Sequence, residues 1–135
     1  MKITIDLDEI LDRIYAESAW HAAYDRDIPT LTPDNARMLE MRVEDGLNEL
    51  RTRLAGYLTQ WNYNPHIDKQ NISLTLKTKH EPTTSLVDAM HGAIVGLLSA
   101  YALMCFYGEN GTYYGTAWRL HRTKIMLLLA RDLLD

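Results

Sequence analysis

The sequence predicts a mainly α protein, a four-helix bundle-like single domain over residues 1–135 with a β-hairpin at about residues 61–78, between the second and third helices. Apolar residues recur at three- and four-residue spacing in four long segments, which indicates helices with one buried face. Between the second and third segments the spacing falls to two, which is typical of strands. A length of 135 residues with 47% hydrophobic content is sufficient for one ordinary core.

The first helix is expected over about residues 7–26. Asp6 is suited to cap its start, and Glu9 three residues later completes a capping box. Isoleucines alternate with polar residues just before this helix, at residues 3–7, which indicates a short extended lead-in. Residues 25–33 contain two prolines and predict a connector.

The second helix is expected to begin at Thr32 and Pro33, a pair suited to the N-cap and the first helical position, and to continue to about Leu58. One apolar stripe follows its length, formed by Leu39, Val43, Leu47, Leu50, Leu54 and Leu58. The charged side chains of this segment lie mostly off the stripe, as a solvated face requires.

The hairpin is predicted from two alternating runs on either side of a polar turn at residues 68–71. Pro65 cannot donate a backbone hydrogen bond, so the first strand is expected at an edge. Because an isolated hairpin is marginally stable in water, its apolar face needs a helix or another subunit beneath it. The hairpin therefore supplies the candidate interface residues, Trp61, Tyr63, Ile67, Ile72, Leu74 and Leu76.

The third helix is expected over residues 86–107, with Ser85 and Asp88 as a capping box and Gly108 at its end. It is apolar nearly all round, which predicts the central, most buried helix. Residues 89–108 are also long enough to span a bilayer. We favour a buried helix without a membrane, because small and polar residues dilute the hydrophobicity and amphipathic segments flank it.

The fourth helix is expected over residues 112–133, with an inward face that includes Tyr114, Trp118, Ile125 and Leu128. Arg119, Arg122 and Lys124 lie close together in it and are candidate contacts to nucleic acid or to an acidic partner, with a solvated helix face as the alternative.

Charge is divided along the chain. The net charge is −4, but residues 1–50 carry 12 acidic and 5 basic side chains, whereas residues 51–135 carry 6 acidic and 9 basic ones. Opposite charges on the two halves allow one copy to stack on another. The aromatic residues Trp20 and Tyr24, together with Trp61 and Tyr63, also suit an interface, with core packing as the alternative.

Catalytic chemistry has no recognisable signature in this sequence, so we expect no catalytic or metal-binding residues and no cofactor. The single cysteine, Cys105, cannot form an internal disulfide, which favours a reducing cytoplasm. The enzyme alternative is an all-α metal-dependent nucleotide hydrolase. Its candidate ligands are Glu40, Glu44, Asp45 and Glu49, whose spacing equally fits ordinary surface charges.

The order of the segments resembles a known protein class. Two long helices are followed by YNP…ISLTLKTK, by SLVDAMHGAIVGLLSAYALMCFYG and by a Tyr/Trp-rich helix ending in KIMLLLARDLL. Over about residues 6–132, this arrangement resembles the head-to-tail connector (neck or adaptor) proteins of tailed phages, as found in Bacteroidetes-type prophages. No short motif carries the resemblance, so it assigns no site residues.

The resemblance implies a non-enzymatic structural protein that forms a ring between portal and tail. Its partners would be copies of itself, the portal and tail-completion proteins, and its location the cytoplasm of a bacterial host and then the virion. Non-specific contact with DNA is left open. The alternative is a small helical regulatory or protein-binding module, which would stay monomeric at high concentration.

Overall fold

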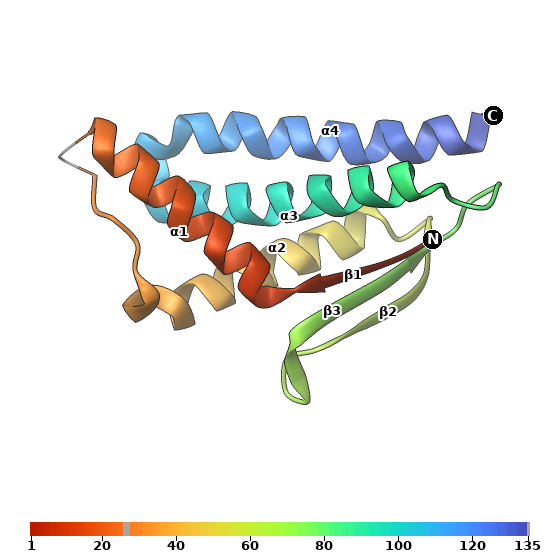
Figure 1. The fold of residues 1–135 in the computed structure, drawn as a ribbon, viewed down its shortest axis with the longest axis horizontal. Helices are drawn as coiled ribbons and strands as arrows, with labels where there is room; N and C mark the ends of the chain where they lie inside the picture. Colours follow the sequence, from red (N-terminus) through yellow and green to blue (C-terminus); the bar gives the residue numbers. More distant parts are fainter. Residues whose placement is uncertain (26–27, 135) are drawn as a thin grey trace.

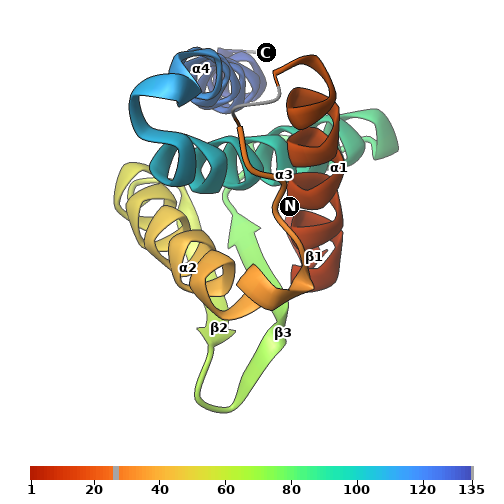
Figure 2. The same ribbon diagram turned by 90° about the vertical axis from the view of Figure 1, so that its left-hand side faces the viewer.

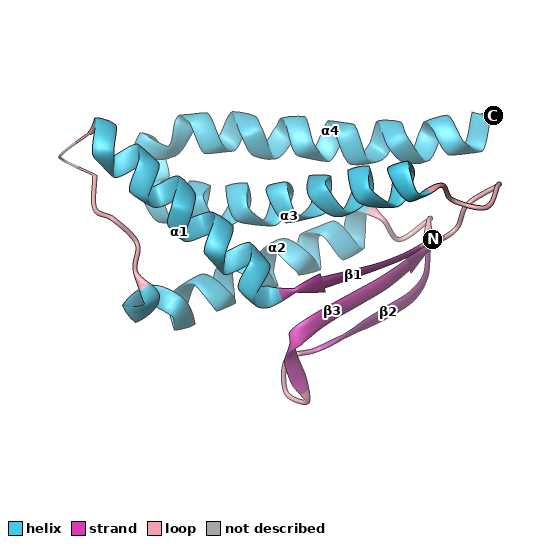
Figure 3. Ribbon diagram, viewed as in Figure 1, coloured by secondary structure: helices cyan, strands magenta, loops and turns pink. Residues whose placement is uncertain are grey.

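Helices and antiparallel strands make up the computed structural model, which describes residues 1–25 and 28–134 (Figures 1 and 3). The elements are β1 (Lys2–Asp6), α1 (Leu7–Tyr24), a 3₁₀ turn (Pro33–Asn35), α2 (Ala36–Arg53), β2 (Leu58–Asn64), β3 (Asp68–Leu76), α3 (Thr84–Tyr107), a second 3₁₀ turn (Gly108–Gly111) and α4 (Thr112–Leu134). The prediction of a mainly α fold with a hairpin between the second and third helices is confirmed.

The hairpin belongs to a three-stranded sheet. The strand order is β1-β3-β2, and all neighbouring strands are antiparallel. The extended lead-in predicted before the first helix is β1, which adds a further strand to the hairpin. Ile3 is paired with Leu74 and Ile5 with Ile72. These four side chains are buried, whereas the alternate residues of β1, Lys2, Thr4 and Asp6, are exposed. The apolar face of β3 is therefore continued by β1 of the same chain.

The ends of the hairpin differ from the prediction. Helix α2 ends at Arg53, and a tight turn in which the amides of Tyr57 and Leu58 donate to the Leu54 carbonyl leads directly into β2. The strand therefore starts at Leu58. The turn between the strands lies at residues 65–67, ahead of the predicted 68–71, because the Asn64 side chain accepts a hydrogen bond from the His66 amide, 3.0 Å away.

The helix caps were partly predicted. Asp6 caps α1 by accepting from the Asp8 amide at 2.9 Å, as expected. Glu9 does not complete the box, because its carboxylate lies 3.3 Å from the His91 Nε2 of α3. Helix α3 begins two residues earlier than predicted, since Thr83, and not Ser85, accepts the hydrogen bond that caps it. The predicted end of the first helix at residue 26 lies outside the described residues, and α1 ends at Tyr24.

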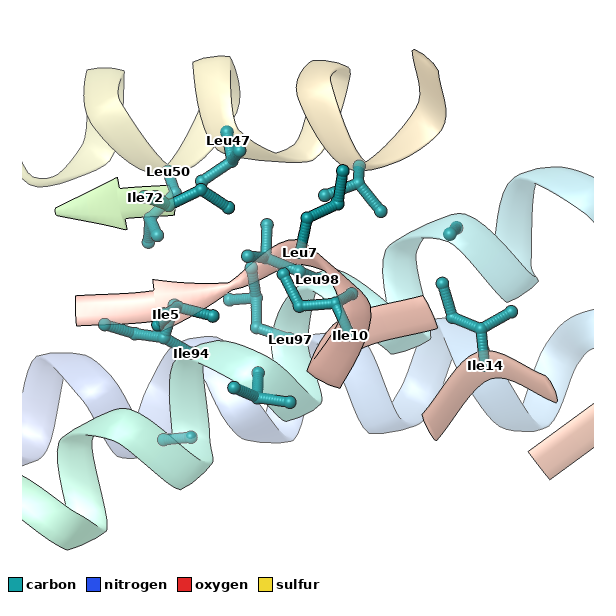
Figure 4. Close-up of a cluster of buried hydrophobic side chains, with 14 of the residues drawn as sticks. Ile5, Leu7, Ile10, Ile14, Leu47, Leu50, Ile72, Ile94, Leu97 and Leu98 are labelled. Atoms are coloured by element: carbon teal, nitrogen blue, oxygen red, sulfur yellow. The ribbon is translucent and has the colours of Figure 1, made fainter. Parts of the chain in front are cut away.

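Helix α3 is the centre of the core (Figure 2), with α4 on one side and α1, α2 and the sheet on the other. Figure 4 shows apolar side chains from β1, α1, α2 and β3 meeting those of α3. By length and composition alone α3 could cross a membrane, but 61% of its most apolar window is buried inside the chain. The core helix of a water-soluble protein has the same properties.

A buried chain of hydrogen bonds holds the connector between α1 and α2. The Leu31 amide donates to the Ser18 hydroxyl at 2.7 Å, and Ser18 lies 2.8 Å from the Tyr107 hydroxyl. Tyr107 in turn donates to the Pro29 carbonyl. Ser18 is fully buried, so these bonds satisfy polar groups that water does not reach.

Helices α3 and α4 approach closely at Gly96. A β-carbon built on Gly96 would lie 2.5–2.9 Å from atoms of the His121 ring, whereas a β-carbon on Gly92 would have no neighbour within 4 Å. Only one glycine of the Gly92-x-x-x-Gly96 pair therefore serves helix packing. On α4, Tyr114 and Ile125 are buried as predicted, and Trp118 and Leu128 are half-buried.

This difference predicts different effects of the same substitution at two sites. Gly96→Ala should leave the free energy of unfolding about 1–3 kcal/mol below that of Gly92→Ala, because the added methyl group overpacks the contact with the His121 ring. Gly92→Ala, the matched control, should raise it by about 0.5–1 kcal/mol through helix propensity alone. Urea denaturation followed by circular dichroism measures both, and equal changes would contradict the close contact.

Candidate interaction surfaces

Three of the six candidate interface residues on the hairpin belong to the chain's own core. Ile72, Leu74 and Leu76 are fully or almost fully buried. This burial corrects the prediction that they face a neighbouring subunit. They are buried because β1 extends the sheet, and because α1 and α3 of the same chain cover its apolar face.

Trp61 and Tyr63 are half-buried against α2 of the same chain. The guanidinium of Arg51 lies 5.5 Å from the centre of the Trp61 ring. Burial, followed by the nearby carboxylates of Glu44 and Glu40, raises the pKa of the Tyr63 hydroxyl. Of the six candidates, Ile67 alone is fully exposed, at 85%, in the turn. The edge strand β2 also has two irregularities in its register, which disfavour pairing with a strand from another chain.

A charge introduced at a buried position of the hairpin should lower stability far more than one introduced at its exposed turn. Leu74→Lys places an unpaired ammonium in the core and should cost more than about 4 kcal/mol, a large part of the stability of a domain this size. Ile67→Lys, the control in the exposed turn, should change stability by less than about 0.5 kcal/mol. Thermal unfolding measures both, and a stably folded Leu74→Lys protein would contradict the assigned core.

The basic stretch of α4 is divided between two sides of the helix. Arg122 lies over the Trp118 ring at 4.8 Å, and Arg53 from α2 lies 5.9 Å from the same ring. Arg119, one turn before Arg122, is exposed and donates to the Gly115 carbonyl. Lys124 is about 200° around the helix from Arg122. The three predicted contact residues therefore do not form one patch.

Lys124 lies near His121, and so does Arg13 of α1. Burial first, and then the charges of Arg13 from α1 and of Lys124, lowers the pKa of His121. A small pocket lies beside His121, and its lining also includes Arg13, Glu17 and Gly96. His121 thus lies in the seam between α1, α3 and α4.

The lowered pKa of His121 predicts a loss of stability in mild acid. In the unfolded chain the His121 imidazole becomes protonated near pH 6.5, whereas in the folded protein it becomes protonated only at a lower pH. Stability from His121 is therefore complete above about pH 6.5 and falls as the pH drops from there toward the folded pKa. Urea denaturation from neutral to mildly acidic pH tests this. His121→Gln should reduce the slope, His66→Gln in the exposed turn is the control, and an unchanged slope in His121→Gln would contradict the assignment.

Aromatic residues gather where α1 ends beside the start of α4. Tyr107 and Tyr114 stack with ring centres 5.7 Å apart, and the His21 Nδ1 lies 3.2 Å from the Tyr114 hydroxyl. Burial, with a smaller contribution from the Glu17 carboxylate, raises the pKa of Tyr114 to about 12. These contacts fix the carboxyl end of α1 against α3 and α4.

The outer face of the same end carries two exposed aromatic side chains. Trp20 is 60% and Tyr24 77% exposed, and their ring centres lie 4.8 Å apart. The expectation of exposed aromatics is confirmed for this pair, which we call the aromatic knob.

A groove that no sequence pattern predicted lies between α4 and the end of α2. Its volume is about 580 Å³, and its lining is Arg53, Tyr57, Arg122, Thr123, Met126, Leu127 and Ala130. Apolar side chains form much of the wall, and the two arginines bring positive charge to it. The groove arises because α4 packs mainly on α3 and leaves space beside α2. We call it the α2–α4 groove.

Three of the four acidic residues of α2 that were candidate metal ligands take part in ion pairs. Glu40 lies 3.4 Å from the Lys69 ammonium, and Asp45 and Glu49 lie 3.3 and 3.2 Å from arginines of the same helix, Arg42 and Arg53. Within the described part of the chain, no group of three or more His, Cys, Asp or Glu side chains is placed to hold a metal ion.

The one cysteine lies on the third helix. Cys105 is exposed on α3, although its helix is mostly buried.

Comparison of the chain with models of protein families, with curated proteins and with solved structures finds no match.

Proposed function

We propose that this chain is a non-enzymatic structural protein that assembles with copies of itself. The supporting observation is that negative and positive charge are separated onto two different helices, each of which also exposes apolar surface. Helix α1 carries four acidic side chains against one arginine, whereas α4 carries Arg119, Arg122, Lys124 and Arg131 against one aspartate. Both helices also expose large apolar side chains, Trp20 and Tyr24 on α1, and Tyr113, Leu120 and Leu127 on α4.

The separation of charge favours a contact between unlike surfaces. If α4 packed on α4 of another copy, arginine would face arginine at the centre of the contact, and like charges across an interface are unfavourable. If α4 packed on α1 of another copy, opposite charges would meet. A contact between two different surfaces repeats from copy to copy and produces a closed ring or an open filament.

A ring is the form that the resemblance to phage head-to-tail connectors implies. In that role the protein would dock between portal and tail-completion proteins, assemble in the cytoplasm of a bacterial host and become part of the virion. Arg119 and Lys124, which are both exposed on α4, are the residues of the basic stretch open to non-specific contact with DNA phosphates.

A small protein-binding module is the second candidate function. The observation that favours it is the α2–α4 groove, since a groove of about 580 Å³ with apolar and basic walls also fits an acidic segment of a different protein.

The mass of the protein in solution distinguishes the two functions. Light scattering from low to high micromolar concentration should show a defined oligomer whose population rises with concentration. The association should weaken as salt is added, because opposite charges contribute to it. A monomer at every concentration and salt condition would contradict self-assembly and favour the binding module.

A further inference from the structure

The aromatic knob has the composition of an interface anchor. Tryptophan and tyrosine are enriched among the residues that dominate binding energy, because they bury a large rigid surface at low entropic cost. Trp20 and Tyr24 contact each other and otherwise remain largely exposed. Behind the knob on the same helix, Glu17 and Arg13 line the small pocket beside His121, and the exposed carboxylate of Asp12 lies two turns before Trp20.

The α2–α4 groove offers the knob apolar surface and positive charge. Tyr57, Met126 and Leu127 supply apolar wall, and Leu127 is 64% exposed on the chain alone. Arg122 and Arg53 flank the groove and stack on the Trp118 ring. The ion pair of Arg53 with Glu49 offsets part of its charge, so Arg122 is the main unlike charge that the groove offers to an acidic helix.

Knob and groove lie toward opposite ends of the molecule. Figure 1 shows the carboxyl end of α1, which carries the knob, at the left of the long axis, and the carboxyl-terminal half of α4 at the right. The groove is lined by that half of α4 together with the end of α2. A chain therefore cannot place its own knob in its own groove, whereas a second copy can reach it.

We infer that Trp20 and Tyr24 of one copy insert into the α2–α4 groove of a second copy, with Arg122 of the groove facing the acidic side of α1. This inference rests on the proposed self-assembly and identifies the surfaces that carry it. The contact is head-to-tail, so every copy in an assembly uses its knob on one side and its groove on the other.

The size of the knob predicts a weak individual contact. Two aromatic side chains bury about 150–250 Å² each. A stable interface of standard size buries about 800 Å² on each partner. A pair of copies held by the knob alone should therefore dissociate readily, and larger assemblies should form only as the concentration rises or when a ring closes.

Two variants that each lose one surface test the inference. The knob variant carries Trp20→Ala and Tyr24→Ala, and the groove variant carries Leu127→Glu, a substitution at an exposed position that should leave the fold intact. Adding Arg122→Glu gives a second groove variant with reversed charge. The matched controls are Met41→Ala on α2 and Lys77→Glu after β3, which change exposed residues outside the knob, the groove and α4. Circular dichroism establishes that each variant is folded.

The decisive measurement is light scattering of each variant alone and of the two mixed in equal amounts. Each variant alone should be monomeric where the wild-type protein assembles, and the controls should assemble like the wild type. At high micromolar concentration, where so weak a contact is populated, the mixture should form a one-to-one heterodimer and nothing larger, because it contains a single intact knob paired with a single intact groove. That result would support the inference, since no symmetric interface gives it.

Other results would overturn it in distinguishable ways. If the wild type assembles and the folded variants assemble equally well, the interface lies elsewhere and self-assembly stands. If both variants are monomeric but do not combine on mixing, the two surfaces do not contact each other. If the wild type is monomeric under all conditions, both the inference and the proposed function fail.

Discussion

The fold depends on covering helix α3, which is apolar on nearly every side. One neighbouring helix cannot bury such a surface, so α1, α2 and the sheet take one side and α4 takes the other (Figure 2). The closest approach, at Gly96 and His121, sets the seam between α3 and α4. Because α4 is occupied mainly with this one helix, its outer face and the space beside α2 stay open.

The pairing of β1 with β3 has the next largest consequence. A two-stranded hairpin would leave an apolar face for another subunit to cover. With β1 in place, Ile3 and Ile5 extend that face and the chain covers it with its own helices. The surfaces left for other molecules are therefore on the helices, chiefly the end of α1 and the outer side of α4.

Buried polar contacts keep those two surfaces in fixed positions. Ser18 ties the connector to Tyr107, and His21 contacts Tyr114, so the end of α1 that carries Trp20 and Tyr24 is fastened to α3 and α4. At the other end, Trp118 lies between Arg53 and Arg122 and joins the wall of the groove to α2. Unlike surfaces held in fixed positions toward the two ends of the molecule suit the head-to-tail assembly that we propose.

Local patterns in the sequence determined the helices, the cap at Asp6 and the presence of two alternating strands, because periodicity and capping depend on residues a few positions apart. They also located α3 as the central helix, since a segment that is apolar all round has no face for water. Only the tertiary structure decided that β1 joins β3, that Ile72, Leu74 and Leu76 are core, that the basic stretch is split, and that a groove forms between Arg53 and Leu127. Each of these depends on which distant segments meet, and the spacing of residues along the chain does not specify that.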